Sequence, residues 1–160
     1  MKTKNPNRPV LPALAPGKFY GHLDASVPAD PETFLRGHDW ACILDGLSEL
    51  TTVCHGVSLR AGWWHNPKTG EPVGSVPEKL MLTVSEVSEA MEADRKGLMD
   101  DKLPHRAGVE VELADVVIRV FDLAGALGLD LPSALREKMI FNTQRPDHKP
   151  ENRAAGGKAY

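Results

Sequence analysis

Between residues 39 and 143, apolar residues recur every three or four positions in four separate stretches. In the first stretch, "DWACILDGLSELTTVCHGVSLRAG", the apolar residues Ile43, Leu47 and Leu50 follow this spacing, which is the period of an α-helix. No stretch shows the strict apolar–polar alternation of a β-strand. The pattern therefore predicts an all-α fold, a bundle of four main helices.

Glycine, proline and aspartate residues mark where these helices begin and end. The helical part begins near Pro31 or Asp39, and Gly62 ends the first long helix before the loop "WWHNPKTGEPVGSVP". The later helices are predicted over about residues 78–96, 109–127 and 130–143. Gly97 is expected just after the second helix, and Asp130 is expected to cap the fourth.

The two ends of the chain have a different composition. "NPNRPVLPALAPGKFYG" cannot form a regular helix, because proline lacks the backbone N–H that helical hydrogen bonds need. The tail "RPDHKPENRAAGGKAY" is polar and rich in proline and glycine. We predict an irregular extension over residues 1–38, a helical domain over 39–149 and a polar tail over 150–160.

Charge and cysteine content narrow the class of protein. A net charge of −3 gives no general reason to expect nucleic acid or an anionic membrane as a partner. The two cysteines, Cys42 and Cys54, suggest neither a disulfide framework nor a zinc site. No apolar run approaches the ~18 residues of a membrane span, and no signal peptide is recognisable. We expect a cytoplasmic protein.

Two acidic pairs interrupt the apolar pattern. "SEVSEAMEAD" carries Glu86 and Glu89, and "VEVELADVVIRV" carries Glu112 and Asp115. Residues three apart lie about 60° apart around a helix, so each pair points to one side. Each pair taken alone is most simply a solvated helix face. Packed antiparallel, the two helices would instead bring four carboxylates together, and these would repel one another strongly unless cations neutralised them.

The residue types in this cluster restrict which cation it could bind. Di-iron bundles use Glu-x-x-His pairs, and neither helix has a histidine at that spacing. Carboxylate oxygens suit a hard ion, Mg²⁺ or Mn²⁺. Because protein-bound Mg²⁺ commonly completes its shell with water and substrate phosphates, the pattern points to phosphate chemistry.

The fourth helix carries a polar and cationic stripe. In "KMIFNTQRPDHK", Lys138, Asn142 and Arg145 are spaced i, i+4 and i+7. Basic residues favour helix C-termini for reasons of the helix dipole alone, so this motif is weak by itself. Beside four carboxylates, it would suit phosphate oxygens.

In combination these motifs resemble the MazG-like all-α nucleoside triphosphate pyrophosphohydrolases. The resemblance covers about residues 40–149 and includes "GWW" before the second helix and "LGLDLPSALREKM" after the third. It implies Mg²⁺-dependent cleavage between the α- and β-phosphates of a nucleoside triphosphate, giving the monophosphate and pyrophosphate. The metal ligands and catalytic residues that the resemblance implies are Glu86, Glu89, Glu112 and Asp115.

The resemblance also assigns phosphate contacts to the fourth helix, at Lys138, Asn142 and Arg145. Beyond that helix the chain departs from the family, because "PENRAA" separates Lys149 from the terminal "GGKAY". Whether Lys149 or Lys158 reaches a phosphate stays open. Relatives usually build the site across a dimer, so we expect a homodimer or a dimer of dimers.

The loop before the acidic helices offers aromatic and imidazole groups. Trp63 and Trp64 are either lids over the core or, for one of them, a surface on which a base stacks. His55 and His65 are either structural or hydrogen-bond partners of a base. Arg119 and Asp122 continue the line of Glu112 and Asp115 and either contact the substrate or pair with each other.

Three alternatives to this enzyme stay open. Within enzymes, the related phosphoribosyl-ATP pyrophosphatases come next, although the loop with two tryptophans resembles the nucleotide-cleaning members more closely. The chain could also be a regulatory protein that binds nucleotide or metal without turnover. A purely structural helical module would leave the acidic pairs unexplained and should gain no stability from divalent ions.

Overall fold

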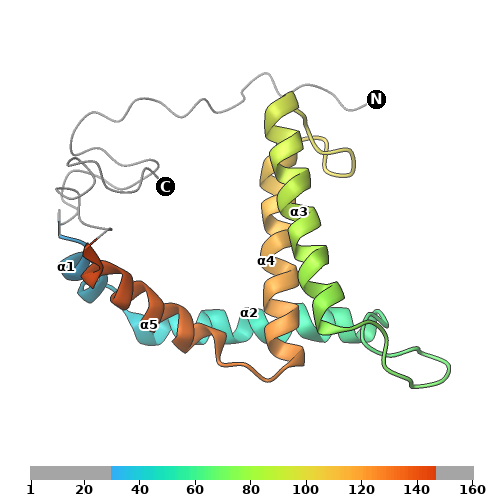
Figure 1. The fold of residues 1–160 in the computed structure, drawn as a ribbon, viewed down its shortest axis with the longest axis horizontal. Helices are drawn as coiled ribbons and strands as arrows, with labels where there is room; N and C mark the ends of the chain where they lie inside the picture. The colour runs from blue at the N-terminus through green and yellow to red at the C-terminus, as the bar shows by residue number, and fades with distance from the viewer. Residues whose placement is uncertain (1–29, 147–160) are drawn as a thin grey trace. The chain divides into compact units, whose positions relative to one another are not determined.

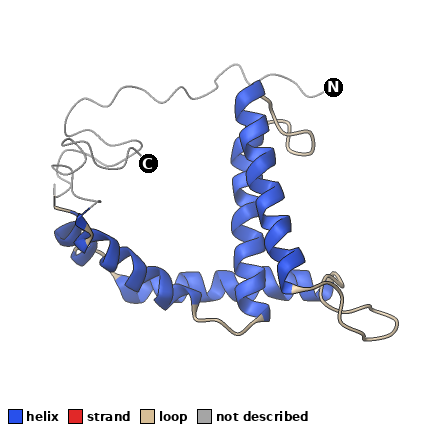
Figure 2. Ribbon diagram, in the orientation of Figure 1, coloured by secondary structure: helices blue, strands red, loops and turns tan. Residues whose placement is uncertain are grey.

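The computed structural model describes residues 30–146, which form five α-helices (Figure 1). The helices are α1 (Pro31–Arg36), α2 (Trp40–Arg60), α3 (Val76–Lys96), α4 (Gly108–Ala126) and α5 (Leu131–Gln144). Within the described residues, β-structure is limited to two isolated bridges, in the loops after α2 and α3 (Figure 2). The all-α prediction is confirmed, and the four long helices begin and end close to the predicted positions.

The first helical stretch is interrupted. The short helix α1 is capped by Asp30, whose carboxylate accepts a hydrogen bond from the N–H of Thr33 at 2.8 Å. Gly37 ends α1, and Asp39 starts α2 by accepting from the N–H of Cys42. Both start points that the sequence suggested, Pro31 and Asp39, are therefore used, one by each helix.

The described chain divides into two compact units. One contains residues 48–129, that is, the C-terminal part of α2 with α3 and α4. The other contains α1, the start of α2 and α5. We call them the hairpin unit and the α5 unit. The predicted extension is described only from residue 30, and the predicted tail 150–160 lies outside the described residues.

In the hairpin unit, α3 and α4 lie side by side and antiparallel (Figure 1). Helix α3 begins at its N-cap Ser75 and ends at Gly97, whose φ of 60° is the left-handed conformation that glycine adopts most easily. The chain returns through residues 98–107 and enters α4 at Gly108. A methyl group at Gly108 would lie 3.0 Å from Cβ of Ala93, so the missing side chain lets the helices approach closely.

In the α5 unit, α1 packs on α5. Leu35 is buried, and its carbonyl accepts a hydrogen bond from the indole N–H of Trp40 at 2.8 Å. The guanidinium of Arg136 lies over the Trp40 ring, 5.7 Å from its centroid. These contacts join the neighbouring helices α1 and α2 to α5, which lies about 100 residues farther along the chain.

A second close approach joins α2 to α4 within the hairpin unit. A Cβ atom at Gly125 would lie 2.6 Å from Cβ of His55, which is closer than two carbon atoms can pack. Glycine at this position therefore allows the C-terminal part of α2 to lie against α4.

Replacing Gly125 with alanine should lower the free energy of unfolding by about 1–2 kcal/mol, because the steric overlap outweighs the roughly 1 kcal/mol by which alanine favours a helix. Gly46→Ala is the matched control, since nothing lies within 4 Å of its Cβ position in α2. Urea denaturation should show this control equal to or more stable than wild type. A Gly125→Ala protein as stable as the control would contradict the close approach.

Candidate functional site

Three of the predicted acidic residues meet at the interface between α3 and α4. One carboxylate oxygen from each of Glu86, Glu89 and Glu112 lies within 4.8 Å of the other two. Glu86 and Glu112 are buried, with exposed fractions of 7% and 8%, whereas Glu89 is exposed. The i, i+3 spacing on each helix and the antiparallel packing together bring these groups to one level of the hairpin. We call these three residues the acidic cluster.

Asp115, the fourth predicted residue, lies beside the acidic cluster. It lines the same cavity of about 540 Å³, whose walls carry six acidic and two basic side chains. Its carboxylate is not among the three that converge within 4.8 Å. The cavity thus has a tight group of three carboxylates with a fourth at its margin.

Burial and the neighbouring negative charges make Glu112 and Asp115 bind protons more readily than isolated carboxylates do. The pKa of Glu112 is raised above its ordinary value of 4.5, first by burial and then by the charges of Glu89, Glu86 and Asp115. The pKa of Asp115 is raised above 3.8 by burial and by Glu86, partly offset by the positive charge of Arg119. A bound cation would relieve the same repulsion.

Arg119 is the cation that the structure places against the acidic cluster. Its Nε donates to Oε1 of Glu86 at 2.7 Å, and its Nη2 lies 2.5 Å from the same oxygen. Arg119 also lines a second cavity farther along α4. It therefore stands between the acidic cluster and a neighbouring pocket. The sequence offered Asp122 as a possible partner of Arg119, but the carboxylate of Asp122 contacts Trp64 and His55 instead.

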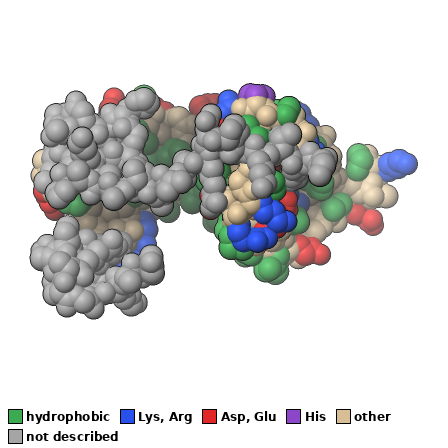
Figure 3. Space-filling view, turned by 90° about the horizontal axis from the view of Figure 1, so that it is seen from above, with side chains coloured by type: hydrophobic (Ala, Val, Ile, Leu, Met, Phe, Trp, Pro, Cys, Tyr) green, Lys and Arg blue, Asp and Glu red, His purple; other side chains and the backbone are tan. Residues whose placement is uncertain are grey.

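The loop between α3 and α4 completes the acidic cavity. The carboxylate of Asp100 accepts hydrogen bonds from the N–H groups of Lys102 at 2.9 Å and Leu103 at 2.6 Å, which shapes the turn. Asp101 and Lys102 also line the cavity. The site residues predicted from the sequence include none from this segment. The signal for it is "DDK", in the short turn that joins two acidic helices. Seen from above, this end of the hairpin displays intermixed basic, acidic and apolar side chains (Figure 3).

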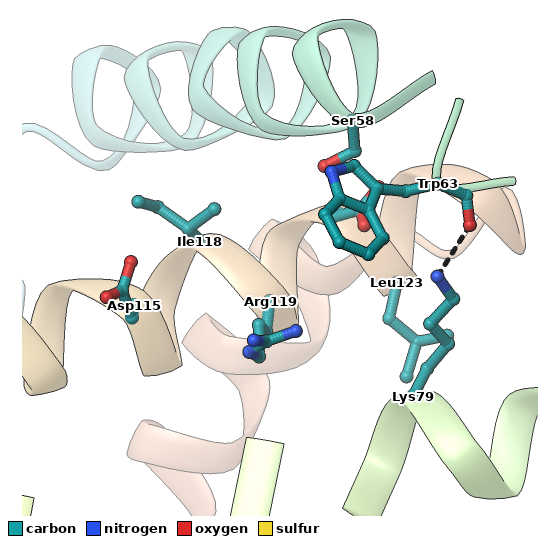
Figure 4. Close-up of a pocket in the computed structure, with 8 residues that line it drawn as sticks. Ser58, Trp63, Lys79, Asp115, Ile118, Arg119 and Leu123 are labelled. Carbon is teal, nitrogen blue, oxygen red and sulfur yellow. Dashed lines mark hydrogen bonds between the residues drawn. The ribbon is translucent and has the colours of Figure 1, made fainter. Parts of the chain in front are cut away.

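The second cavity, of about 220 Å³, has an aromatic wall (Figure 4). Trp63 is 61% exposed and lies beside it together with Ser58, Ile118 and Leu123. Lys79 donates from Nζ to the backbone carbonyl of Trp63 at 2.7 Å. Because Asp115 and Arg119 line both cavities, the aromatic pocket and the acidic cavity adjoin.

The neighbouring Trp64 has a different environment from Trp63. Its indole N–H donates to Oδ1 of Asp122 at 2.8 Å, and Nδ1 of His55 lies 3.0 Å from the same oxygen. Asp122 is buried and lines the aromatic pocket. Trp64 and His55 are thus held in a hydrogen-bonded network behind the pocket wall. His65 is exposed in the loop after α2.

The predicted phosphate-binding residues belong to the α5 unit. The ammonium of Lys138 lies 4.8 Å from the ring centroid of Phe141. Asn142 has a buried Oδ1 that accepts no hydrogen bond within the described part of the chain. Arg145 directly follows the last turn of α5 and donates its backbone N–H to the carbonyl of Asn142. Lys149 and Lys158 lie outside the described residues.

Comparison with known proteins gives one distant similarity. The chain is 25% identical over 134 residues to the Gag polyprotein of Feline immunodeficiency virus (isolate Petaluma). The match includes 77% of this chain but spans only 27% of the polyprotein. No protein-family profile matches the chain, and no solved structure is similar to it. Among the described helices, none is both long and apolar enough to cross a membrane.

Removing one buried charge should stabilise the metal-free protein. Because the folded-state pKa of Glu112 lies above 4.5, the folded protein holds this proton more tightly than the unfolded chain does. The resulting stability is present at acid pH and is lost as pH rises from 4.5 through the raised value. Glu112→Gln should therefore unfold at higher urea than wild type at pH 7, and the difference should shrink toward pH 4.

Glu92→Gln on α3 serves as the control for this prediction. Hydrogen bonds from Arg95 and Lys96 lower the pKa of Glu92 to about 2, so its charge favours the folded state at neutral pH. This variant should gain no stability at pH 7. Equal effects of the two substitutions would show that the acidic cluster carries no special repulsion.

Proposed function

We propose that this protein is a MazG-like, Mg²⁺-dependent nucleoside triphosphate pyrophosphohydrolase that releases a nucleoside monophosphate and pyrophosphate. One observation carries the proposal: three carboxylates from two helices converge within 4.8 Å beside a pocket with an exposed tryptophan. The first feature suits a divalent cation, and the second suits a flat apolar group such as a base.

The acidic cluster fits a hard cation better than a softer metal. Its donor atoms are all carboxylate oxygens, and neither histidine nor cysteine belongs to the group. The raised pKa of Glu112 is consistent with a site that gains from a bound cation. Mg²⁺, or Mn²⁺ in its place, would activate a water molecule and offset the triphosphate charge. Glu86, Glu89 and Glu112 would hold the ion, with Asp115 as the fourth ligand.

The aromatic pocket would bind the nucleoside. Trp63 is exposed and offers its ring face to a base, while Trp64 is engaged by Asp122. His55 would act through Asp122, by fixing the position of the carboxylate that faces the pocket. A base in this pocket would leave the attached phosphates directed toward the acidic cavity, because the two cavities share Asp115 and Arg119.

Lys138, Asn142 and Arg145 would contribute phosphate contacts from α5. The unused Oδ1 of Asn142 supports a polar partner that the described residues do not supply. Arg145 and Lys138 carry the positive charge that a triphosphate requires. Lys149 is a further candidate by its position after the helix.

We propose a homodimer as the minimal unit, or a dimer of dimers. Helix α3 exposes Leu80, Val84, Val87 and Met91, whose intervals of four, three and four residues form one continuous stripe. Helix α4 exposes Leu113, Val117 and Val120 in the same way. Such stripes are typical of helices that pack against a further helix pair. A second copy of the hairpin offers matching stripes.

Two other functions would share this geometry. A phosphoribosyl-ATP pyrophosphatase would cleave the same type of bond in a different nucleotide, and a panel of substrates separates the two enzymes. A regulatory protein would bind Mg²⁺ and nucleotide but release no pyrophosphate.

The first test of the enzyme is the reaction product. Wild type with Mg²⁺ and a panel of nucleoside triphosphates should release pyrophosphate, and EDTA should abolish the release. Glu89→Gln should lower the rate by more than about 100-fold, because it removes an ion ligand and not merely an outer-shell partner. Glu92→Gln, one turn away on the same helix, should keep the wild-type rate.

Chromatography of the products decides the bond that is cleaved. Monophosphate with pyrophosphate supports the proposal. Diphosphate with orthophosphate, or full activity of Glu89→Gln, would contradict it.

The second test is the oligomeric state. Light scattering should give at least twice the protomer mass of 17.4 kDa. Val87→Glu places a charge in the exposed stripe of α3 and should shift the mass toward one protomer. A wild-type mass of 17.4 kDa at micromolar concentration would exclude the dimer.

A further inference from the structure

Arg119 forms an ion pair with Glu86, one of the three residues of the acidic cluster. Both of its contacting nitrogens approach the same oxygen of Glu86, at 2.7 and 2.5 Å. The Glu86 side chain is 9% exposed, whereas the Arg119 side chain is 37% exposed. The carboxylate is therefore fixed inside the interface, and the guanidinium approaches it from the open side. The arginine is the partner with room to move.

The carboxylate that Arg119 binds is one that a cation at the acidic cluster would also bind. Glu86 belongs to the acidic cluster, whose three carboxylates converge within 4.8 Å. A guanidinium and a divalent ion can each neutralise a carboxylate, and the two cations repel each other at short distance. Binding of an ion by Glu86 would thus weaken its ion pair with Arg119.

The position of Arg119 also determines which group its guanidinium could bind after leaving Glu86. Arg119 lines the aromatic pocket, as Figure 4 shows, and it also lines the acidic cavity, so it lies where the two adjoin. If a nucleotide binds with its base beside Trp63, this junction is where its phosphates would begin. Guanidinium groups bind phosphate oxygens with two parallel hydrogen bonds.

We propose that Arg119 is a counter-ion that changes partners. In the metal-free protein it neutralises Glu86. When a divalent ion binds the acidic cluster, Arg119 is displaced from Glu86 and binds a phosphate of the substrate instead. The inference rests on the proposed function, because it requires that the acidic cluster binds an ion. Arg119 would therefore have two effects of opposite sign: it weakens binding of the ion and strengthens binding of the phosphate. A purely structural ion pair does not have both.

Arg119→Gln tests both effects without measuring turnover. Binding of Mn²⁺ alone, followed by the loss of free Mn²⁺ signal in electron paramagnetic resonance, should become about tenfold tighter, because the competing cation is gone. Binding of pyrophosphate to the Mn²⁺-loaded protein, followed by calorimetry, should weaken by about 10- to 150-fold, because a charge-assisted contact is lost. Arg106→Gln removes the same charge from the exposed Arg106–Glu110 pair and should change neither affinity appreciably.

The outcomes separate the inference from the proposed function. If wild type and Arg119→Gln both fail to bind Mn²⁺, the proposed function and the inference fall together. If wild type binds Mn²⁺ but Arg119→Gln binds it equally or more weakly, the inference alone is wrong. Unchanged pyrophosphate binding also overturns the inference. If Arg119→Gln does not fold, Arg119→Lys replaces it: with charge retained but the paired donors lost, it should still weaken pyrophosphate binding, and normal binding would overturn the inference.

Discussion

Repulsion between carboxylates buried at the interface of α3 and α4 is the constraint on which the hairpin unit depends. Glu86 and Glu112 lie in a part of the protein where water screens charge poorly, and Glu89 faces them. The charge of Glu112 therefore opposes folding at neutral pH. Burial, together with this repulsion, raises the pKa of Glu112, and Arg119 neutralises Glu86 through an ion pair. Buried negative charge is costly to keep, which is a reason to regard it as functional.

The rest of the hairpin unit holds this cluster in place and puts a pocket beside it. Gly108 allows α3 and α4 to approach closely, and Gly125 allows α2 to pack on α4. Asp122 then gathers Trp64 and His55 behind the pocket wall and leaves Trp63 exposed. Two cavities of different chemistry, one acidic and one aromatic, therefore adjoin along a single face of α4. A nucleotide has the same two parts, a flat base and a cation-binding polyphosphate.

Much of the local structure follows from the sequence. Helix α3 ends at Gly97 because of its backbone conformation, and α5 starts at Asp130 because its side chain caps the helix. Both effects depend on neighbouring residues alone. The meeting of Glu86, Glu89 and Glu112 also follows, because i, i+3 spacing and antiparallel packing leave few alternatives. The break between α1 and α2 lay within the predicted start of the helical part, but the sequence did not show that both start points are used.

Other features depend on tertiary geometry that no local pattern encodes. The sequence offered Asp122 as a partner for Arg119, whereas packing brings Glu86 of another helix to it. Trp63 and Trp64 are identical in type and adjacent, yet only the fold makes one exposed and the other hydrogen-bonded. The carboxylate of Asp100 shapes a turn by accepting from the backbone N–H groups of Lys102 and Leu103, and Asp100 also lines the acidic cavity. Lys138, Asn142 and Arg145 share a stripe in the sequence, but the helical period alone does not show what their side chains contact.

The central claim is that the acidic cluster binds a divalent cation, and anomalous X-ray diffraction from crystals soaked in Mn²⁺ tests it most directly. A peak should lie between the carboxylates of Glu86, Glu89 and Glu112, with oxygens at roughly 2.0–2.2 Å, close to the distances of Mg²⁺ sites. In the same crystals the guanidinium of Arg119 should have left Glu86. A saturating soak that gave no peak at these carboxylates, with the Arg119–Glu86 pair intact, would contradict the account.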